Sequence, residues 1–581
     1  MSDVTLTINN QEITVARGTT ILEAARKLDI NIPTLCHLDL GGIGIVSKEA
    51  SCRVCVVEEE GWDKMLPACS TPCREGMRIR TDTVKVIRTR RMMVELLLSD
   101  HPTDCLVCPK SGNCELQKLA ADVGIRKIRY PGKRHHVSMD ASSNAIVRDM
   151  NKCVLCKRCE TMCNDVQTVG ALTDVGRGFK TVVGCTFDLP MHETTCTFCG
   201  QCVAVCPTGA LTEVNNVEKV WTALASRKTV VVQTAPAVRV ALGELFAMPA
   251  GSDVTGQMVT ALRQMGFDYV FDTNFAADVT VMEEAAELVQ RLQDPTARLP
   301  ILTSCCPAWV KFIEHQFGDC LDIPSTAKSP HEIFGALAKT YLAQRIGVDP
   351  KDMVVVSVMP CVAKKYESAR PELGLSEDVS DVDIVITTRE LGTMLKDLGL
   401  NFQNLPEGQF DPLMGESSGA GDVFGVTGGV IEAALRTACF MMTGEESPEI
   451  EFQQLRGFEG IKEAEVTIGE RTLKIACVNG LGHARKVLER VRSGEADYQA
   501  IEIMACPGGC IAGGGQPYHH GDLEILRKRA RAIYQHERAK TIRRAHQNPM
   551  VQKLYADFLG EPLSARCHEL LHTSYVHRHK M

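Results

Sequence analysis

The sequence lacks any long apolar segment. No uninterrupted apolar run reaches the ~18 residues that a membrane-spanning helix needs. The stretch Met1–Ile8 carries no basic and apolar signal region. From these two absences we expect a cytoplasmic protein without a membrane partner.

Signatures of nucleotide and nucleic-acid binding are also missing. Gly480-Leu481-Gly482 is too short for a dinucleotide fingerprint, so this chain alone is not expected to use NAD(H). The net charge of -8 argues against a nucleic-acid partner. The basic run 527–544 has helical spacing and contains Glu537, which predicts a solvated helix. His568-Glu569-Leu570-Leu571-His572 matches a zinc-protease pattern, but too little chain follows it and we interpret it as accidental.

Cysteine, by contrast, is abundant. The 581 residues include 26 cysteines, and the charged fraction of 23% is that of a globular protein with several domains. In a large chain without a signal region, so many cysteines indicate metal sites rather than disulfides. Most of them fall in closely spaced groups, and these groups predict a series of iron–sulfur sites.

The first cysteine group follows a predicted hairpin and helix. Residues 4–15 alternate apolar and polar around Asn9-Asn10, and Thr20 with Glu23 forms a capping box for a helix to about Leu28. This order suits a β-grasp ferredoxin domain. Four cysteines could bind a [2Fe–2S] cluster, which we favour, or zinc. They are Cys36, Cys52, Cys55 and Cys69, and the first gap is longer than in plant-type ferredoxins.

One histidine and three cysteines make the second group. His101 is followed by Cys105, Cys108 and Cys114. On spacing alone this set could bind zinc or a [4Fe–4S] cluster.

The third and fourth groups form an internal repeat typical of two-cluster bacterial ferredoxins. In such a repeat the last cysteine of each run binds the other cluster. One [4Fe–4S] cluster is then expected at Cys153, Cys156, Cys159 and Cys206, and another at Cys196, Cys199, Cys202 and Cys163.

The rest of the chain has an α/β pattern. Apolar strand-like runs at 230–232, 299–302, 353–358 and 382–386 alternate with helical patterns, which predicts a parallel sheet. Cys305-Cys306 and Cys361 each follow such a strand, where α/β sheets place ligands. A third, glycine-rich segment contains Cys506 and Cys510, and glycine lets the backbone approach a bulky inorganic group.

These three late segments resemble the active-site signatures of [FeFe]-hydrogenases, and the first modules resemble the large subunit of NADH dehydrogenase. The resemblance implies a multidomain α/β chain. The expected domains are a [2Fe–2S] β-grasp domain (1–80), a small [4Fe–4S] domain with one histidine and three cysteine ligands (81–140), a 2[4Fe–4S] ferredoxin domain (141–217), a large hydrogenase domain (218–530) and a small-subunit-like tail (531–581).

The resemblance also implies the active-site cofactor, the H-cluster. Its [4Fe–4S] part would be held by Cys306, Cys361, Cys506 and Cys510, with Cys510 bridging to a diiron unit that carries CO, cyanide and a dithiolate. One [2Fe–2S] and three accessory [4Fe–4S] clusters would relay electrons. Maturation proteins would install the diiron unit.

A proton route follows from the same resemblance. Glu284, Glu287 and Arg291 share one helix face, which by spacing alone would more often be an exposed face with an ion pair. The resemblance instead implies a relay through Cys305, Glu284, Ser325, Glu287 and Arg291.

Further residues are expected around the cofactor. Lys364 would donate to a cyanide, whereas Lys365 is expected in solvent. Ala237 and His331 stand where some relatives carry serine and glutamine, and either could retune the site. The predicted pocket walls are Pro236, Ala237, Met359, Phe424 and Met504, and the cysteines expected to be structural are Cys73, Cys185, Cys320, Cys439, Cys477 and Cys567.

We therefore expect an enzyme for reversible H2 oxidation. Expected partners are a flavin- and NAD(P)-binding subunit and a small [2Fe–2S] subunit like those of NADH dehydrogenase, together with ferredoxin in an electron-bifurcating complex. Two alternatives stay open: the hydrogenase subunit of a hydrogen-dependent CO2 reductase, and a non-catalytic electron-transfer or sensory protein.

Overall fold

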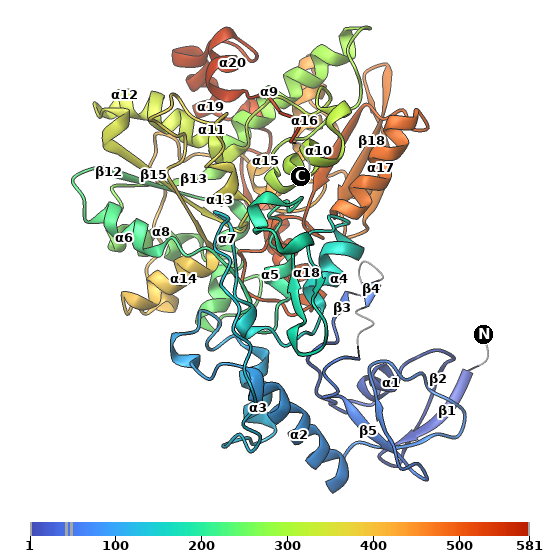
Figure 1. The fold of residues 1–581 in the computed structure, drawn as a ribbon. Coiled ribbons are helices and arrows are strands. Elements are labelled where there is room, and N and C mark those ends of the chain that lie inside the picture. Colours follow the sequence, from blue (N-terminus) through green and yellow to red (C-terminus); the bar gives the residue numbers. More distant parts are fainter. Residues whose placement is uncertain (1–2, 41–44, 47–49, 579–581) are drawn as a thin grey trace.

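The computed structural model describes residues 3–40, 45–46 and 50–578, and in these ranges it is a mixed α/β protein (Figure 1). The sequence predictions that concern Met1, Ser2 and residues 579–581 of the tail lie outside the described residues. No helix in the described ranges is long and apolar enough to cross a membrane.

The N-terminal part is a five-stranded sheet with one covering helix, at the lower right of Figure 1. Strands β1 (Asp3–Ile8) and β2 (Gln11–Ala16) form the predicted antiparallel hairpin, and both turn residues, Asn9 and Asn10, have positive φ. Helix α1 (Ile21–Lys27) begins with the predicted Thr20–Glu23 capping box. The sheet is completed by β7 (Arg78–Arg80), β5 (Val56–Glu59) and β6 (Met65–Pro67).

Two helices and a small ferredoxin-like unit connect this domain to the rest. Helix α2 (Val84–Asp100) ends directly before His101, and α3 (Glu115–Asp122) begins directly after Cys114. The ferredoxin-like unit contains the short helices α4 (Arg158–Thr161) and α5 (Gln201–Val205), and strand β8 (Ile146–Arg148) pairs with β11 (Leu211–Glu213).

The large domain contains two four-stranded sheets. The first, in the order β13-β12-β15-β16, is wholly parallel, as the sequence predicts. The second, β14-β19-β18-β17, is parallel except for its edge strand β17. Their bounds are β12 Thr229–Thr234, β13 Tyr269–Asp272, β15 Met353–Met359, β16 Ile384–Thr387, β14 Ile301–Leu302, β17 Ile461–Ile468, β18 Arg471–Asn479 and β19 Ala500–Met504.

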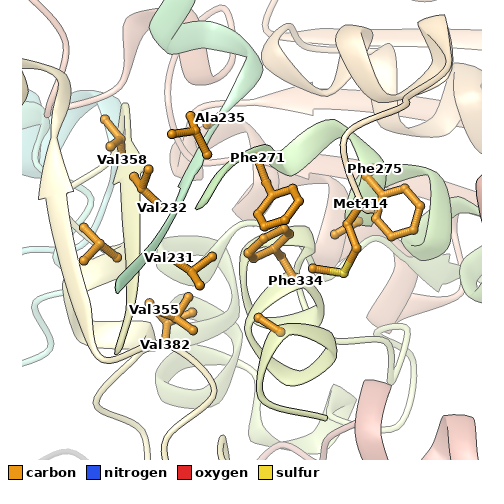
Figure 2. Close-up of a cluster of buried hydrophobic side chains, with 14 of the residues drawn as sticks. Val231, Val232, Ala235, Phe271, Phe275, Phe334, Val355, Val358, Val382 and Met414 are labelled. Atoms are coloured by element: carbon orange, nitrogen blue, oxygen red, sulfur yellow. The ribbon is translucent and has the colours of Figure 1, made fainter. Parts of the chain in front are cut away.

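The core beside the first sheet joins strands to two buried helices (Figure 2). Helices α9 (Thr273–Gln293) and α11 (Pro330–Leu337) pack against each other, and Phe271 and Phe334 lie 5.6 Å apart between their ring centroids. Burial of such apolar surface is worth about 25 cal/mol per Å2. This core fixes α9, the helix that carries Glu284, Glu287 and Arg291 of the predicted proton relay.

The basic C-terminal run forms a helix, as the sequence predicts, but only one part of that helix is exposed to solvent. In α18 (Leu523–Ala539), Arg529 and Glu537 are fully buried. Arg529 forms ion pairs with Glu244, and Glu537 pairs with Arg436 and Arg543. The buried part was not predicted because Glu244 and Arg436 lie far from this helix in the sequence.

The end of the chain lies against α9. Helices α19 (Pro549–Leu554) and α20 (Ala565–Leu571) lead to His572, whose Nε2 lies 2.9 Å from the Glu283 carboxylate and whose Nδ1 lies 2.8 Å from the Thr326 hydroxyl. His572 therefore contacts α9, as expected if its match to a protease pattern is accidental.

Candidate active site and iron–sulfur sites

The four cysteines of the first group converge. Hydrogen bonds with the thiols of Cys52 and Cys69 lower the pKa of Cys36, and a hydrogen bond with Cys69 lowers the pKa of Cys55 to about 7. Cys73 is buried near this set, but no thiol is among the groups that shift its pKa, which burial raises to about 11. The donor set fits the predicted [2Fe–2S] cluster, with Cys73 left outside.

His101 lies at the C-terminal end of α2, where the chain turns into the cysteines of the second group. Its Nδ1 is buried and has no hydrogen-bond partner among the described residues. Burial also lowers the pKa of His101, which keeps the imidazole neutral and able to coordinate. Burial raises the pKa of Cys114, and the nearby Cys108 thiol adds to this effect.

The eight cysteines of the repeat separate into the two predicted sets. Burial raises the pKa of Cys156, and its thiol neighbours that add to this rise are Cys206 and Cys153. Burial likewise raises the pKa of Cys196, whose thiol neighbours are Cys163 and Cys199. The second set lines a small apolar cavity, which contains Cys163, Cys196, Cys199 and Cys202. Each set thus includes the last cysteine of the other run.

The three late cysteine segments meet at one pocket. Cys305 and Cys306 follow β14, Cys361 follows β15, and Cys506 follows β19, so all three segments leave the carboxyl ends of parallel strands. The pocket is lined by Cys305, Cys306, Cys361, Cys506 and Cys510, by Lys364, and by all five predicted wall residues, Pro236, Ala237, Met359, Phe424 and Met504.

Glycines let the backbone close around this pocket. Gly509 has φ +94°, and a Cβ there would lie 2.6 Å from the backbone nitrogen of Thr427. A Cβ at Gly513 would lie 2.2 Å from the Pro360 carbonyl oxygen, and one at Gly514 would lie 2.7 Å from that of Gly200. The last contact brings the fourth cysteine group next to the pocket.

The pocket chemistry fits a thiolate-bound cofactor. Five cysteines line a pocket whose walls are mostly apolar, and thiolates are the usual ligands of iron–sulfur clusters. Lys364 supplies a cation: burial opposes its charge, but Glu367, 2.6 Å away, outweighs burial and raises the pKa of Lys364. Its Nζ also donates to the Cys305 carbonyl at 3.2 Å.

The neighbouring lysine is not in solvent, and that prediction is wrong. Lys365 is buried, and its Nζ lies 2.7 Å from the Glu390 carboxylate and donates to the Val214 carbonyl at 2.7 Å. Adjacent residues of a helix point in different directions, so Lys364 faces the pocket while Lys365 connects α13 (Lys364–Glu367) to α14 (Thr388–Asp397).

The predicted relay residues are close together but do not form one unbroken chain. Ser325 Oγ donates to Glu287 at 2.7 Å, and Arg291 Nη2 donates to Glu287 at 2.6 Å. Glu284 is buried, and burial raises its pKa to about 8. No hydrogen bond joins Glu284 to Ser325, because Glu284 Oε2 has no partner within the described part of the chain.

Ser304 is a residue that sequence reasoning missed. Its backbone nitrogen and its hydroxyl lie 3.3 Å and 3.4 Å from Glu284 Oε1, and the hydroxyl donates to the Ala327 carbonyl at 2.6 Å. The sequence feature that could have identified Ser304 was its position next to Cys305.

Comparison with known proteins agrees with this geometry. Residues 228–514 match the family described as iron only hydrogenase large subunit, C-terminal domain, and residues 523–578 match iron hydrogenase small subunit. Residues 2–84 match a 2Fe-2S iron-sulfur cluster binding domain, residues 90–129 the NADH-ubiquinone oxidoreductase-G iron-sulfur binding region, and residues 190–212 a 4Fe-4S binding domain.

Whole-chain relatives are also found. The chain is 54% identical to the NADP-reducing hydrogenase subunit HndD of Solidesulfovibrio fructosivorans, with 100% of both chains covered. It is 41% identical to iron hydrogenase 1 of Clostridium pasteurianum, over 98% of this chain and 99% of that one. A solved [FeFe]-hydrogenase HydA1 variant from Chlamydomonas reinhardtii is 42% identical, with a TM-score of 0.57, over 62% of this chain and 99% of that chain.

The fold and the site together define an iron–sulfur oxidoreductase. With full-length relatives well above 30% identity, the chain belongs to the [FeFe]-hydrogenase family. It is a hydrogenase with [2Fe–2S] and [4Fe–4S] ferredoxin-like domains.

Proposed function

We propose that this chain interconverts H2 with protons and electrons at an H-cluster held by Cys306, Cys361, Cys506 and Cys510. When bound, that cofactor supplies an open metal position at which H2 is formed or split. The observation that carries the proposal is the convergence of these four cysteines, with Cys305 and Lys364, on one apolar pocket. The same convergence argues against a non-catalytic role.

The protein moves the proton. Cys305 lines the pocket, and burial, with Glu284 next in importance, raises the pKa of its thiol, so the thiol holds a proton near neutral pH. Glu284 is the next acid toward the surface, followed by Glu287 with Ser325 and then Arg291. The half-buried guanidinium of Arg291 also donates to the Ile323 and Pro324 carbonyls, which fixes the outer end of the route.

The accessory clusters are proposed to carry the electrons. The Cys361 thiol is among the groups that raise the pKa of Cys199, and the Cys199 thiol is among those that raise the pKa of Cys506. These effects support a position of the second ferredoxin-type site beside the pocket. The two ferredoxin-type sites are related in the same way, because Cys202 helps to raise the pKa of Cys159 and Cys206 helps to raise the pKa of Cys202.

The proposed electron-transfer route has two outer branches. Cys36, Cys52 and Cys156 belong to one buried cluster, so the [2Fe–2S] site adjoins the first ferredoxin-type site. A Cβ on Gly209 would lie 2.8 Å from Cys108 Sγ, and Cys114 packs against the same buried cluster, so the His101 site also adjoins this unit. Two branches suit two electron partners, which we propose to be a flavin- and NAD(P)-binding subunit with its small [2Fe–2S] subunit, and ferredoxin in a bifurcating complex.

The test is anaerobic purification of the native complex, with H2 formation measured from a reduced low-potential dye and from NAD(P)H. We expect dye-driven activity from the matured chain alone, and NAD(P)H-driven activity only with the flavoprotein present. Cys361→Ser should abolish both, whereas Cys477→Ser, a buried cysteine outside the pocket, should retain them. A molybdenum or tungsten formate dehydrogenase in place of the flavoprotein would favour the CO2 reductase instead.

A further inference from the structure

A buried acid–imidazole pair lies behind Lys364, outside the relay described above. His331 and Glu332 are in the first turn of α11, and each is 1% exposed. His331 Nε2 lies 2.6 Å from Glu332 Oε1, and His331 Nδ1 lies 2.8 Å from the Ser357 hydroxyl.

The carboxyl group of Glu332 is buried without a hydrogen bond. Neither His331 Nε2 nor either carboxylate oxygen of Glu332 has a hydrogen-bond partner among the described residues, although Nε2 and Oε1 are 2.6 Å apart. A buried carboxylate that no donor stabilises favours its protonated, neutral form.

The pair is connected to the pocket through Glu367. The Glu367 carboxylate lies 3.4 Å from His331 Nε2 and 2.6 Å from Lys364 Nζ. His331 and Lys364 both line the cofactor pocket. A negative charge on Glu332 therefore changes the electrostatic potential at Lys364, with the His331 imidazole and the Glu367 carboxylate between them.

We propose that His331 and Glu332 form a buried proton-binding site, and that loading or emptying it changes the charge around Lys364. Glu332 here is a positioning residue, since it acts through its neighbours. The consequence for Lys364 rests on the proposed function; proton binding itself does not.

The surrounding charges leave Glu332 without a cation of its own. Lys364 pairs with Glu367, Lys328 with Asp381 at 2.7 Å, and Arg370 with Glu314 at 2.7 Å. The elements packed on α11 also contribute two buried acids, Asp278 and Glu284 of α9, which form no ion pair with a described residue. The ion pairs on these elements are Glu283 with His572, between α9 and the residue after α20, and Lys339 with Asp383 at 2.9 Å, while the buried Cys567 of α20 is neutral.

Burial therefore decides the protonation of the pair. It raises the pKa of Glu332 to about 7, against the opposing effect of Lys364, Lys328 and Arg370, and it lowers the pKa of His331 to about 3. The proton resides on the carboxyl group below about pH 7 and leaves above it. Its loss adds a negative charge, which strengthens the hold of Lys364 on its own proton and makes a nearby redox centre harder to reduce.

A divalent metal ion fits these residues less well. The ligand atoms of His331, Glu332 and Glu367 lie within 4.8 Å of one another. Ligands at about 2.1 Å from one tetrahedral ion stand more than about 3 Å apart, so the 2.6 Å contact between His331 and Glu332 does not suit a shared metal ion. The ammonium of Lys364 already neutralises Glu367.

The test is infrared spectroscopy of the full-length protein with its clusters, following the carbonyl stretch of protonated carboxylic acids against pH. The wild-type spectrum minus that of Glu332→Gln should contain one such band, titrating near pH 7. His331→Gln should lower the midpoint by about one pH unit, because the amide can donate to the ionised carboxylate. Asp278→Asn, which alters a buried acid bonded to Ser418 and Asn548, is the matched control and should leave the Glu332 band unchanged.

A second measurement follows Lys364. In the matured enzyme, the cofactor CO and cyanide bands should shift between about pH 6 and about pH 8, and part of that shift should vanish in Glu332→Gln but persist in Asp278→Asn. Absence of a Glu332 band, or a midpoint below about pH 5, would overturn the proposal. So would one zinc or manganese ion per chain that is lost in Glu332→Gln. A normal Glu332 titration in a chain without H2 activity would instead count against the proposed function.

Discussion

Arg529 Nη1 donates a hydrogen bond of 2.8 Å to the backbone carbonyl of Ile511, the residue after Cys510. The same guanidinium binds Glu244 at 2.6 Å and the Pro517 carbonyl at 3.0 Å. A helix from the basic C-terminal run thus holds the glycine-rich cysteine loop in place. The position of this loop thus involves a buried cation that does not line the cofactor pocket.

Replacing Arg529 by methionine should weaken this loop. It leaves the Glu244 carboxylate largely buried without its partner, which costs about 3–5 kcal/mol. We expect a lower unfolding temperature and faster loss of active-site iron, measured by thermal denaturation and iron analysis. Arg527→Met, on the exposed side of the same helix, is the control and should change little. Equal behaviour of the two variants would contradict the role of Arg529.

Cys305→Ala should retain all clusters and nearly abolish turnover. The thiol lines the pocket but is not needed among the four proposed ligands, and loss of a proton-transfer group typically costs about 10²–10⁴-fold in rate. H2 production and iron content should be measured on the same preparation. Turnover within about twofold of the wild type would remove Cys305 from the relay.

Glu284→Gln should slow H2 production by a similar factor without loss of iron. Burial raises the pKa of Glu284 to about 8, so wild-type production should decline as pH rises through about 8, where the carboxyl loses its proton. The variant should lack this alkaline limb. A full pH profile of both proteins makes the comparison, and identical profiles would mean that the protons take another route.

The pH dependence of stability should change in the same variant. Because the folded pKa of Glu284 lies above its unfolded value, the carboxyl contributes full stability below about pH 4 and this contribution is lost as pH rises through about 8. The unfolding temperature of Glu284→Gln should therefore fall less over that range. Matching slopes for variant and wild type would show that Glu284 titrates normally.

Ser304→Ala should move the alkaline limb of H2 production to higher pH. Burial raises the pKa of Glu284, and the Ser304 backbone and hydroxyl groups oppose that rise, so removing the hydroxyl removes part of the opposition. Ser325→Ala acts on Glu287 instead and should lower the rate without moving the limb. The two profiles, recorded side by side, distinguish the two serines.

Much of the fold followed from local sequence patterns. The Asn9-Asn10 hairpin, the Thr20–Glu23 capping box and the parallel strands around residues 230, 355 and 385 are where alternation, capping and apolar runs put them. The cysteine groups were equally readable, because ligand spacing within a loop is a property of the local chain. The contacts of Lys365, Arg529 and Ser304 could not be predicted from the sequence, since each side chain depends on a partner distant in the sequence.

The sequence alone determined the residue types, the cysteine spacing and hence the kinds of iron–sulfur site this protein builds, because short-range ligand geometry is written into consecutive residues. Only the tertiary structure decided which lysine faces the pocket, which arginine holds the Cys510 loop and which carboxyl groups stay protonated. Those outcomes depend on burial and on partners brought together from separate strands and helices. Desolvation is a property of the folded surroundings and not of the residue.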